Sequence, residues 1–247
     1  MTPEEACRLV SRIDDDSVLM KLAQSTYASE DSSPNWSGSG RPETTSAAVL
    51  CHGITARDFC AWNRAHFGLY ESFVEHLPLR RRIALDLGCG GGQRTNWLGE
   101  FFERVIGLDK DEQAIAFAHS MNPRLNVAYR HGLIKWLAKP PGFDAIYCVE
   151  VFEHVEPSMQ DDFLRAALGL LAPDGRLFLT TPREEVRQRP HVGILRAQDE
   201  DAFLRRWSSR IIAWDGLSVP SNDVLLATEG VPSCARGEGT HHRIVFG

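Results

Sequence analysis

Short apolar runs alternate with segments of helical periodicity from residue 82 to the end of the chain. The apolar runs are "RIALDLG", "RVIGLD", "NVAYR", "FDAIYCVEV", "RLFLTTP", "RIIAW" and "HHRIVFG". The segments with helical spacing between them are 95–102, 111–121, 157–171 and 199–209. Repeated strand–helix units are typical of a mainly parallel sheet that is covered by helices on both faces. The pattern therefore predicts an α/β fold.

The first 78 residues follow a different pattern. Residues 3–28 favour a helix, because Pro3 suits a first turn and Glu4 and Glu5 suit the positive end of the helix dipole. Residues 29–46 are rich in Ser, Gly and Pro, which is typical of a flexible linker or lid. Residues 55–76 carry aromatic residues at helical spacing. We expect a helical cap over 1–78 with a linker at 29–46, followed by the main domain over 79–247.

Charge and cysteine content indicate which partners and which cellular compartment to expect. The 247-residue chain has a net charge of −6, which argues against broad binding to nucleic acid. Its six cysteines include no CxxC pair, as expected for free thiols in a reducing compartment. The N-terminus is acidic where a signal peptide would be basic, and no apolar run reaches the length of a membrane span. We expect a cytoplasmic protein that does not bind membranes.

A glycine-rich turn follows the first apolar run, in "IALDLGCGGG". Such a turn between a strand and a helix predicts a nucleotide-like ligand that lies close to the backbone. Asp86 precedes the turn, where a carboxylate would help to bind a cationic ligand but not a pyrophosphate. Asp109 ends the second run and is placed to bind ribose hydroxyls, while Asp111 is free to cap the following helix.

These motifs, with "FDAIYCVEVFEHV" and "LAPDGRLFLTTP" after them, resemble the class I S-adenosylmethionine-dependent methyltransferases. Within that class the chain is most similar to the group that includes the ubiquinone-biosynthesis O-methyltransferases. The resemblance implies a Rossmann-like, seven-stranded, mostly parallel sheet with its last strand antiparallel. It also implies S-adenosyl-L-methionine as cofactor and a small-molecule acceptor, with oxygen favoured over nitrogen or carbon. We expect a monomer or a homodimer.

The resemblance also assigns residues to the cofactor. Asp86 would orient the glycine loop and help to receive the methionine amino group. Gly88, Cys89 and Gly90 would run beside the methionine and the ribose. Asp109 would bind the ribose hydroxyls, with Lys110 beside the adenine. Many relatives carry an Asp where this chain has Leu133, so the backbone of Gly132 and Leu133 and apolar packing would hold the adenine.

The loop "CVEVFEHV" supplies the predicted catalytic group, Glu150, Glu153 and His154. If Val151 begins a helix, these three side chains share one face. His154 is the predicted general base, because imidazole accepts protons near neutral pH. Glu150 is also placed at the cofactor. The same face, joined by His191, resembles the metal site of quinone and small-RNA methyltransferases, but we assign no metal.

Residues outside these loops complete the expected site. Trp62, His66 and Tyr70 would close over the cofactor, and the segment 216–239 would shape the acceptor pocket. Three other functions stay open at this stage. They are a metal-dependent RNA 2′-O-methyltransferase, a non-catalytic cofactor-binding module, and an NAD-dependent dehydrogenase. Asp86 and the GxGxG spacing of the loop speak against the dehydrogenase.

Overall fold

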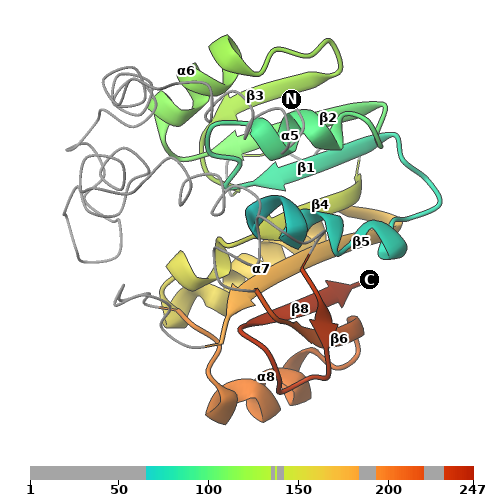
Figure 1. Ribbon diagram of the computed structural model, residues 1–247, viewed down its shortest axis with the longest axis vertical. Helices are drawn as coiled ribbons and strands as arrows, with labels where there is room; N and C mark the ends of the chain where they lie inside the picture. The colour runs from blue at the N-terminus through green and yellow to red at the C-terminus, as the bar shows by residue number, and fades with distance from the viewer. Residues whose placement is uncertain (1–64, 135–136, 138–141, 184–192, 220–230) are drawn as a thin grey trace.

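The computed structural model describes residues 65–134, 137, 142–183, 193–219 and 231–247 (Figure 1). Its centre is one mixed sheet with the strand order β3-β2-β1-β4-β5-β8-β6-β7. The strands are β1 (Ile83–Leu87), β2 (Arg104–Asp109), β3 (Val127–His131), β4 (Phe143–Val149), β5 (Leu171–Pro182), β6 (Ile211–Leu217), β7 (Ser233–Cys234) and β8 (His241–Phe246). The alternating pattern of the sequence thus correctly predicted an α/β fold.

Five strands are parallel, and the antiparallel pairing begins at the C-terminal end of the chain. β3, β2, β1, β4 and β5 pair in parallel, whereas β8 lies antiparallel between β5 and β6. This confirms a mostly parallel sheet with an antiparallel last strand. The expected count of seven strands was one too low. The extra strand, β7, has only two residues and pairs with the end of β6, so periodicity could not detect it.

The helices are shorter than the sequence pattern suggested. Besides the helical residues 65–71, they are α5 (Gln93–Leu98), α6 (Glu112–Met121), α7 (Gln160–Gly169) and α8 (Glu200–Trp207). Single 3-10 turns are η2 (Val74–His76), η4 (Phe152–His154), η5 (Pro157–Met159) and η6 (Ala197–Asp199). The predicted helix over 157–171 is divided, because its first residues form η5 and Leu171 already begins β5.

Both faces of the sheet are covered. On one face, the helical residues 65–71 and α5 pack on β1, β4 and β5 through a core that includes Phe73, Leu98, Tyr147 and Phe178. α6 covers the same face at β3 through Ala118 and Tyr129. On the other face, α7 and α8 pack through a second core. No helix of the described ranges is long and apolar enough to cross a membrane.

Residues 65–77, which belong to the predicted N-terminal cap, lie across the middle of the sheet (Figure 1). Tyr70 stacks on Tyr147 of β4 with a centroid distance of 5.5 Å, and Phe73 packs on Phe178 of β5 at 5.0 Å. The rest of the predicted cap, including the linker at 29–46, lies outside the described residues.

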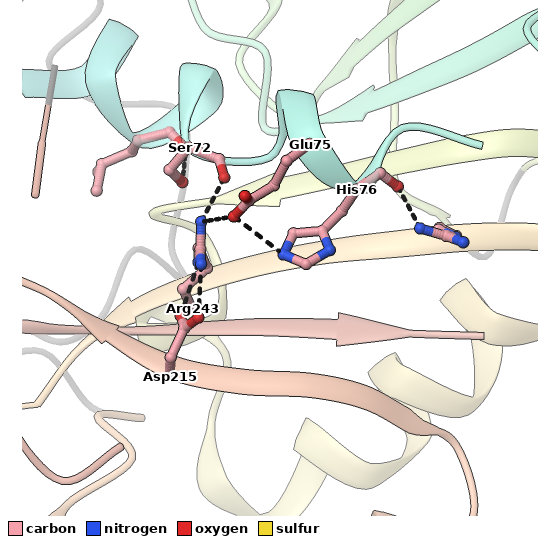
Figure 2. Close-up of polar contacts among 7 residues, drawn as sticks. Ser72, Glu75, His76, Asp215 and Arg243 are labelled. Atoms are coloured by element: carbon pink, nitrogen blue, oxygen red, sulfur yellow. Dashed lines mark hydrogen bonds and ion pairs between the residues drawn. The ribbon is translucent and has the colours of Figure 1, made fainter. Parts of the chain in front are cut away.

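Arg243 of β8 fastens this cap to the antiparallel strands (Figure 2). Its guanidinium donates two hydrogen bonds to the carboxylate of Asp215 in β6, at 2.7 and 2.5 Å. The same group donates to the backbone carbonyl of Ser72 at 2.5 Å and to Glu75 at 3.0 Å. Because Arg243 is buried, these contacts hold the end of the cap helix in a defined place on the sheet.

Candidate functional site

The strand order reverses between β1 and β4, and this reversal locates the candidate site. In open α/β sheets, ligands bind beyond the carboxyl ends of the strands at such a reversal. The loops after β1, β2 and β4 meet at this edge, because β1 pairs with β2 on one side and with β4 on the other. Most of the predicted site residues lie in these loops or in the loop after β3.

The glycine loop after β1 leaves room for a ligand. Gly88 and Gly90 have φ angles of 69° and 51°, in the left-handed region that favours glycine. A Cβ at Gly88 would lie 2.4 Å from Cγ2 of Val151, whereas a Cβ at Gly90 would have no atom within 4 Å. Gly88 is therefore required for packing inside the protein, and Gly90 borders open space.

Asp109 is bound to the glycine loop. Its carboxylate accepts hydrogen bonds from the backbone N–H of Gly90 at 2.8 Å and from that of Asp111 at 2.9 Å. Burial raises the pKa of Asp109, although these two backbone donors oppose the shift. Asp111 caps α6 by accepting from the N–H groups of Gln113 and Ala114, so the predicted cap is confirmed. Asp109 is therefore not needed for capping, and its carboxylate is bound to the backbone of Gly90, which borders open space.

Asp86 is fully buried, and its partners are two hydroxyl groups inside the protein. Tyr70 donates to Oδ1 at 2.7 Å, and Thr95 donates to Oδ2 at 2.6 Å. Burial raises the pKa of Asp86 to about 6, even though both hydroxyl groups lower it. The structure thus links Asp86 to the cap helix and to α5, rather than exposing its carboxylate at the surface of the loop.

The other predicted cofactor residues lie around Asp109. The Cys89 side chain is buried against α6 and Tyr129, and this burial raises the pKa of its thiol. Gly132 donates its N–H to the carbonyl of Asp109 at 2.8 Å. Leu133 is 37% exposed beside it. Lys110 follows Asp109 directly, and its carbonyl contacts His131.

The expected helical face at Glu150, Glu153 and His154 does not form. Only the 3-10 turn η4 follows β4, and Glu150 before it has a φ of 57°, which breaks the helical spacing. Glu150 contacts Thr180, whereas Glu153 lies near Thr181. Successive residues of a strand point to opposite faces, so the two carboxylates lie toward different faces of β5.

Glu153 and His154 remain close together. Nε2 of His154 lies 4.0 Å from Oε1 of Glu153, and the His154 side chain is 34% exposed. Burial and then the charge of Glu150 raise the pKa of Glu153 well above its ordinary value. Within the described part of the chain, no group of three or more His, Cys, Asp or Glu side chains is placed to hold a metal ion. His191, like Trp62, lies outside that part.

Glu150 has partners that the sequence pattern did not suggest. Thr180 of β5 donates to its Oε1 at 2.9 Å, and Nε2 of His241 in β8 lies 3.3 Å from its Oε2. Burial alone would raise the pKa of Glu150, but His241, His66 and Thr180 together lower it to about 2. Glu150 is therefore a carboxylate anion that contacts Thr180 and His241 at the site.

The comparisons with known proteins agree with this geometry. Residues 85–179, from β1 to β5, match the family model described as a methyltransferase domain. The glycine loop, Asp109 and the strands on both sides of the reversal lie within these residues. Residues 85–179 are therefore similar to a methyltransferase domain.

Two relatives of this methyltransferase domain are ubiquinone biosynthesis O-methyltransferases. The mitochondrial protein of Schizosaccharomyces pombe is 37% identical over 116 residues, which cover 45% of this chain and 42% of the relative. The protein of Pseudomonas fluorescens (strain Pf0-1) is 34% identical over 112 residues, covering 43% and 47%. The chain thus matches less than half the length of either relative.

A solved structure shares the fold of the methyltransferase domain. It is an S-adenosylmethionine-dependent methyltransferase from Mesorhizobium loti, with a TM-score of 0.52 and 17% identity. The similarity covers 72% of this chain and 97% of the other. At this level of identity the comparison supports the fold alone.

Sequence reasoning missed several residues around the candidate site. From the sequence, Thr95, Thr180 and His241 are expected only to lie in a helix or in strands. A signal was present in "HHRIVFG", where three polar residues, His241, His242 and Arg243, begin a strand that is buried throughout. Polar side chains in such a strand need partners, which the sequence could not name.

Proposed function

We propose that this chain is an S-adenosyl-L-methionine-dependent methyltransferase that acts on a small-molecule acceptor, with oxygen as the favoured methyl-accepting atom. The observation that carries the proposal is the position of Asp109, which is hydrogen-bonded to Gly90 beside open space. A carboxylate at the end of the second strand suits the two hydroxyl groups of a ribose. When bound, the cofactor would supply an activated methyl group on a sulfonium.

The residues of the cradle fit this cofactor. Asp109 would accept hydrogen bonds from the ribose hydroxyls. The backbone from Gly88 to Gly90 would lie along the methionine and the ribose. The exposed side chain of Leu133 and the backbone of Gly132 would pack on the adenine, with Lys110 at its edge. Asp86 would act through its hydroxyl partners, by fixing the loop in which the methionine lies.

The loop after β4 would serve the acceptor. β4 lies next to β1 and on the side away from β2, so its loop borders the end of the cradle opposite the ribose. His154 is partly exposed there and is the proposed general base for an acceptor hydroxyl, with Glu153 beside its ring. Methyl transfer needs alignment and exclusion of water, which the cap residues His66 and Tyr70 would help to supply.

Composition bears on the compartment and on the class of acceptor. The net charge of −6 favours a small-molecule acceptor over a nucleic acid, and the cysteine pattern favours the cytoplasm. We place the cap at 1–78 and the catalytic domain at 79–247, and we expect a monomer or a homodimer.

Calorimetric titration tests the proposal directly. Wild-type protein should bind S-adenosylhomocysteine and S-adenosylmethionine, and should not bind NAD. Transfer of a labelled methyl group to small phenols and amines should then be measured with and without a chelator. Binding of NAD would contradict the proposal. Loss of transfer in the chelator would favour the metal-dependent alternative.

A further inference from the structure

The surroundings of Glu150 imply a role for β8 that rests on the proposed function. We propose that His241 and Thr180 position the Glu150 carboxylate to receive the hydrogen-bond donor of the methyl acceptor, an O–H or N–H group. Both positioning residues lie outside residues 85–179, which match the methyltransferase domain model. β8 would then help to determine which acceptors are used.

The backbone of Glu150 is held in a conformation that it would not adopt freely. Among the described residues, only Glu150 and Asp174 combine a positive φ with a side chain. Non-glycine residues rarely adopt this region unless their surroundings enforce it, and such residues are common at active sites. Thr180 enforces it here, because its hydroxyl accepts from the Glu150 N–H at 3.2 Å and donates to Oε1 at 2.9 Å.

His241 fixes the second oxygen of the carboxylate. Its Nε2 lies 3.3 Å from Oε2, and its Nδ1 lies 2.8 Å from the hydroxyl oxygen of Thr240. The Thr240 hydroxyl is held in turn by the Val219 N–H at 3.0 Å. Both ring nitrogens of His241 are therefore engaged within the protein. The ring cannot take a proton from the acceptor by direct contact, so His241 is a positioning residue.

Glu150 keeps the capacity to bind a ligand. Each carboxylate oxygen has two lone pairs, and each has one partner among these contacts. The side chain is 18% exposed, whereas that of His241 is 9% exposed. The end of β4, together with β5 and β8, carries this cluster on the side of β1 away from β2 and Asp109. The partly exposed carboxylate of Glu150 therefore lies on the acceptor side of the proposed site.

The test compares two substitutions of His241 in the full chain. His241→Leu removes the contact with Oε2, whereas His241→Gln keeps a side-chain N–H donor. His119→Gln, on the exposed surface of α6, is the matched control. For each protein, calorimetry gives the Kd of S-adenosylhomocysteine. Methyl transfer to 3,4-dihydroxybenzoate, catechol and benzylamine gives kcat and the KM of the acceptor.

We expect His241→Leu to lower kcat/KM for the acceptor about tenfold or more, as loss of one hydrogen bond to a charged group would do. The Kd of S-adenosylhomocysteine should change less than about twofold on the same scale. His241→Gln should recover most of the loss, and His119→Gln should match the wild type. Equal losses in cofactor binding and in transfer, or no loss at all, would overturn the proposal. Tight Mg²⁺ binding that Glu150→Gln abolishes would also overturn it.

A structural measurement separates this proposal from the proposed function. If wild-type protein binds no S-adenosylhomocysteine, the proposed function fails. If it binds the cofactor but methylates none of the three probes, crystal structures of wild type and His241→Leu decide the positioning role. Movement of the Glu150 carboxylate in the variant would support that role, and an unchanged carboxylate would refute it.

Discussion

The hydroxyl group of Tyr70 donates a 2.7 Å hydrogen bond to Oδ1 of Asp86. This contact joins the cap helix, outside the matched methyltransferase domain, to the residue that precedes the glycine loop. Thr95 of α5 binds the other oxygen, so the two hydroxyl groups hold the buried carboxylate from both sides. The cap is thus directly connected to the part of the chain that would bind the methionine.

Tyr70→Phe should weaken both folding and cofactor binding. The substitution keeps the ring stack on Tyr147 but leaves Oδ1 of a buried carboxylate without its donor. A cost of about 1–3 kcal/mol in the free energy of unfolding is expected. The affinity for S-adenosylhomocysteine should fall several-fold, because the loop loses one of its supports. Denaturant unfolding measures the first effect and calorimetry the second. An unchanged affinity would show that the hydrogen bond between Tyr70 and Asp86 does not contribute to cofactor binding.

Asp109→Ala and Asp111→Ala should differ sharply in cofactor binding. Asp109 is the proposed ribose ligand, so its loss should lower the affinity for S-adenosylhomocysteine about 100-fold, the equivalent of two hydrogen bonds. Asp111 caps α6, so its loss should cost about 1 kcal/mol of stability and leave affinity almost unchanged. Calorimetry and thermal unfolding of the matched pair measure this difference. Equal affinity losses would mean that the loop, rather than Asp109, binds the cofactor.

Protonation of His242 should destabilise the fold in mild acid. The ring is buried, and its Nδ1 accepts from the Trp214 indole N–H at 3.3 Å while Nε2 faces the Leu195 carbonyl at 2.8 Å. A proton added to Nδ1 would face the indole N–H of Trp214, and two donors cannot form a hydrogen bond with each other. Burial lowers the pKa of His242 from 6.5 to about 4, so the unfolded chain binds more protons between these values. The contribution of His242 to stability should therefore fall by roughly 3 kcal/mol as the pH drops from 6.5 to 4.

The contribution of His242 to the free energy of unfolding is obtained by comparing the wild type with a variant that lacks it. Asp86 acts in the opposite direction, because its raised pKa favours the folded state below about pH 6. Unfolding of wild type and His242→Gln should be compared at each pH, since subtraction removes the shared effect of Asp86. The difference between the two proteins should shrink as the pH falls. A difference that is constant from pH 7 to 4 would show that His242 does not titrate as described.

Arg243→Met should detach the cap from the antiparallel strands. The substitution leaves the partly exposed carboxylate of Asp215 without its partner and removes the donor to Ser72 (Figure 2). Loss of these hydrogen bonds to a charged group should cost about 2–3 kcal/mol in the free energy of unfolding. Glu75→Gln is the control, because the Glu75 side chain is 65% exposed and its ion pair should contribute less than about 1 kcal/mol. Similar losses for both variants in denaturant unfolding would contradict this distinction.

The chain's sequence predicted the parallel core of the fold and the loops of the cradle. Apolar runs that are buried on both faces produce a pattern that local sequence shows directly, as in β4. The glycine loop and the cap at Asp111 are also local, because backbone angles and neighbouring N–H groups define them. The short strand β7 was missed because its pairing depends on the position of β6, not on its own two residues.

The partners of the buried charges were decided only by the tertiary structure. The sequence marked Asp86 and Glu150 as important, but it could not show that Tyr70 and Thr95 bind the first and that Thr180 and His241 bind the second. His241 and Glu150 are 91 positions apart in the chain, yet β8 inserts beside β5 and places them 3.3 Å apart. Periodicity shows which face of a strand a residue occupies, whereas a hydrogen bond between strands depends on which strands become neighbours. The order of the strands is determined by the packing of the whole sheet.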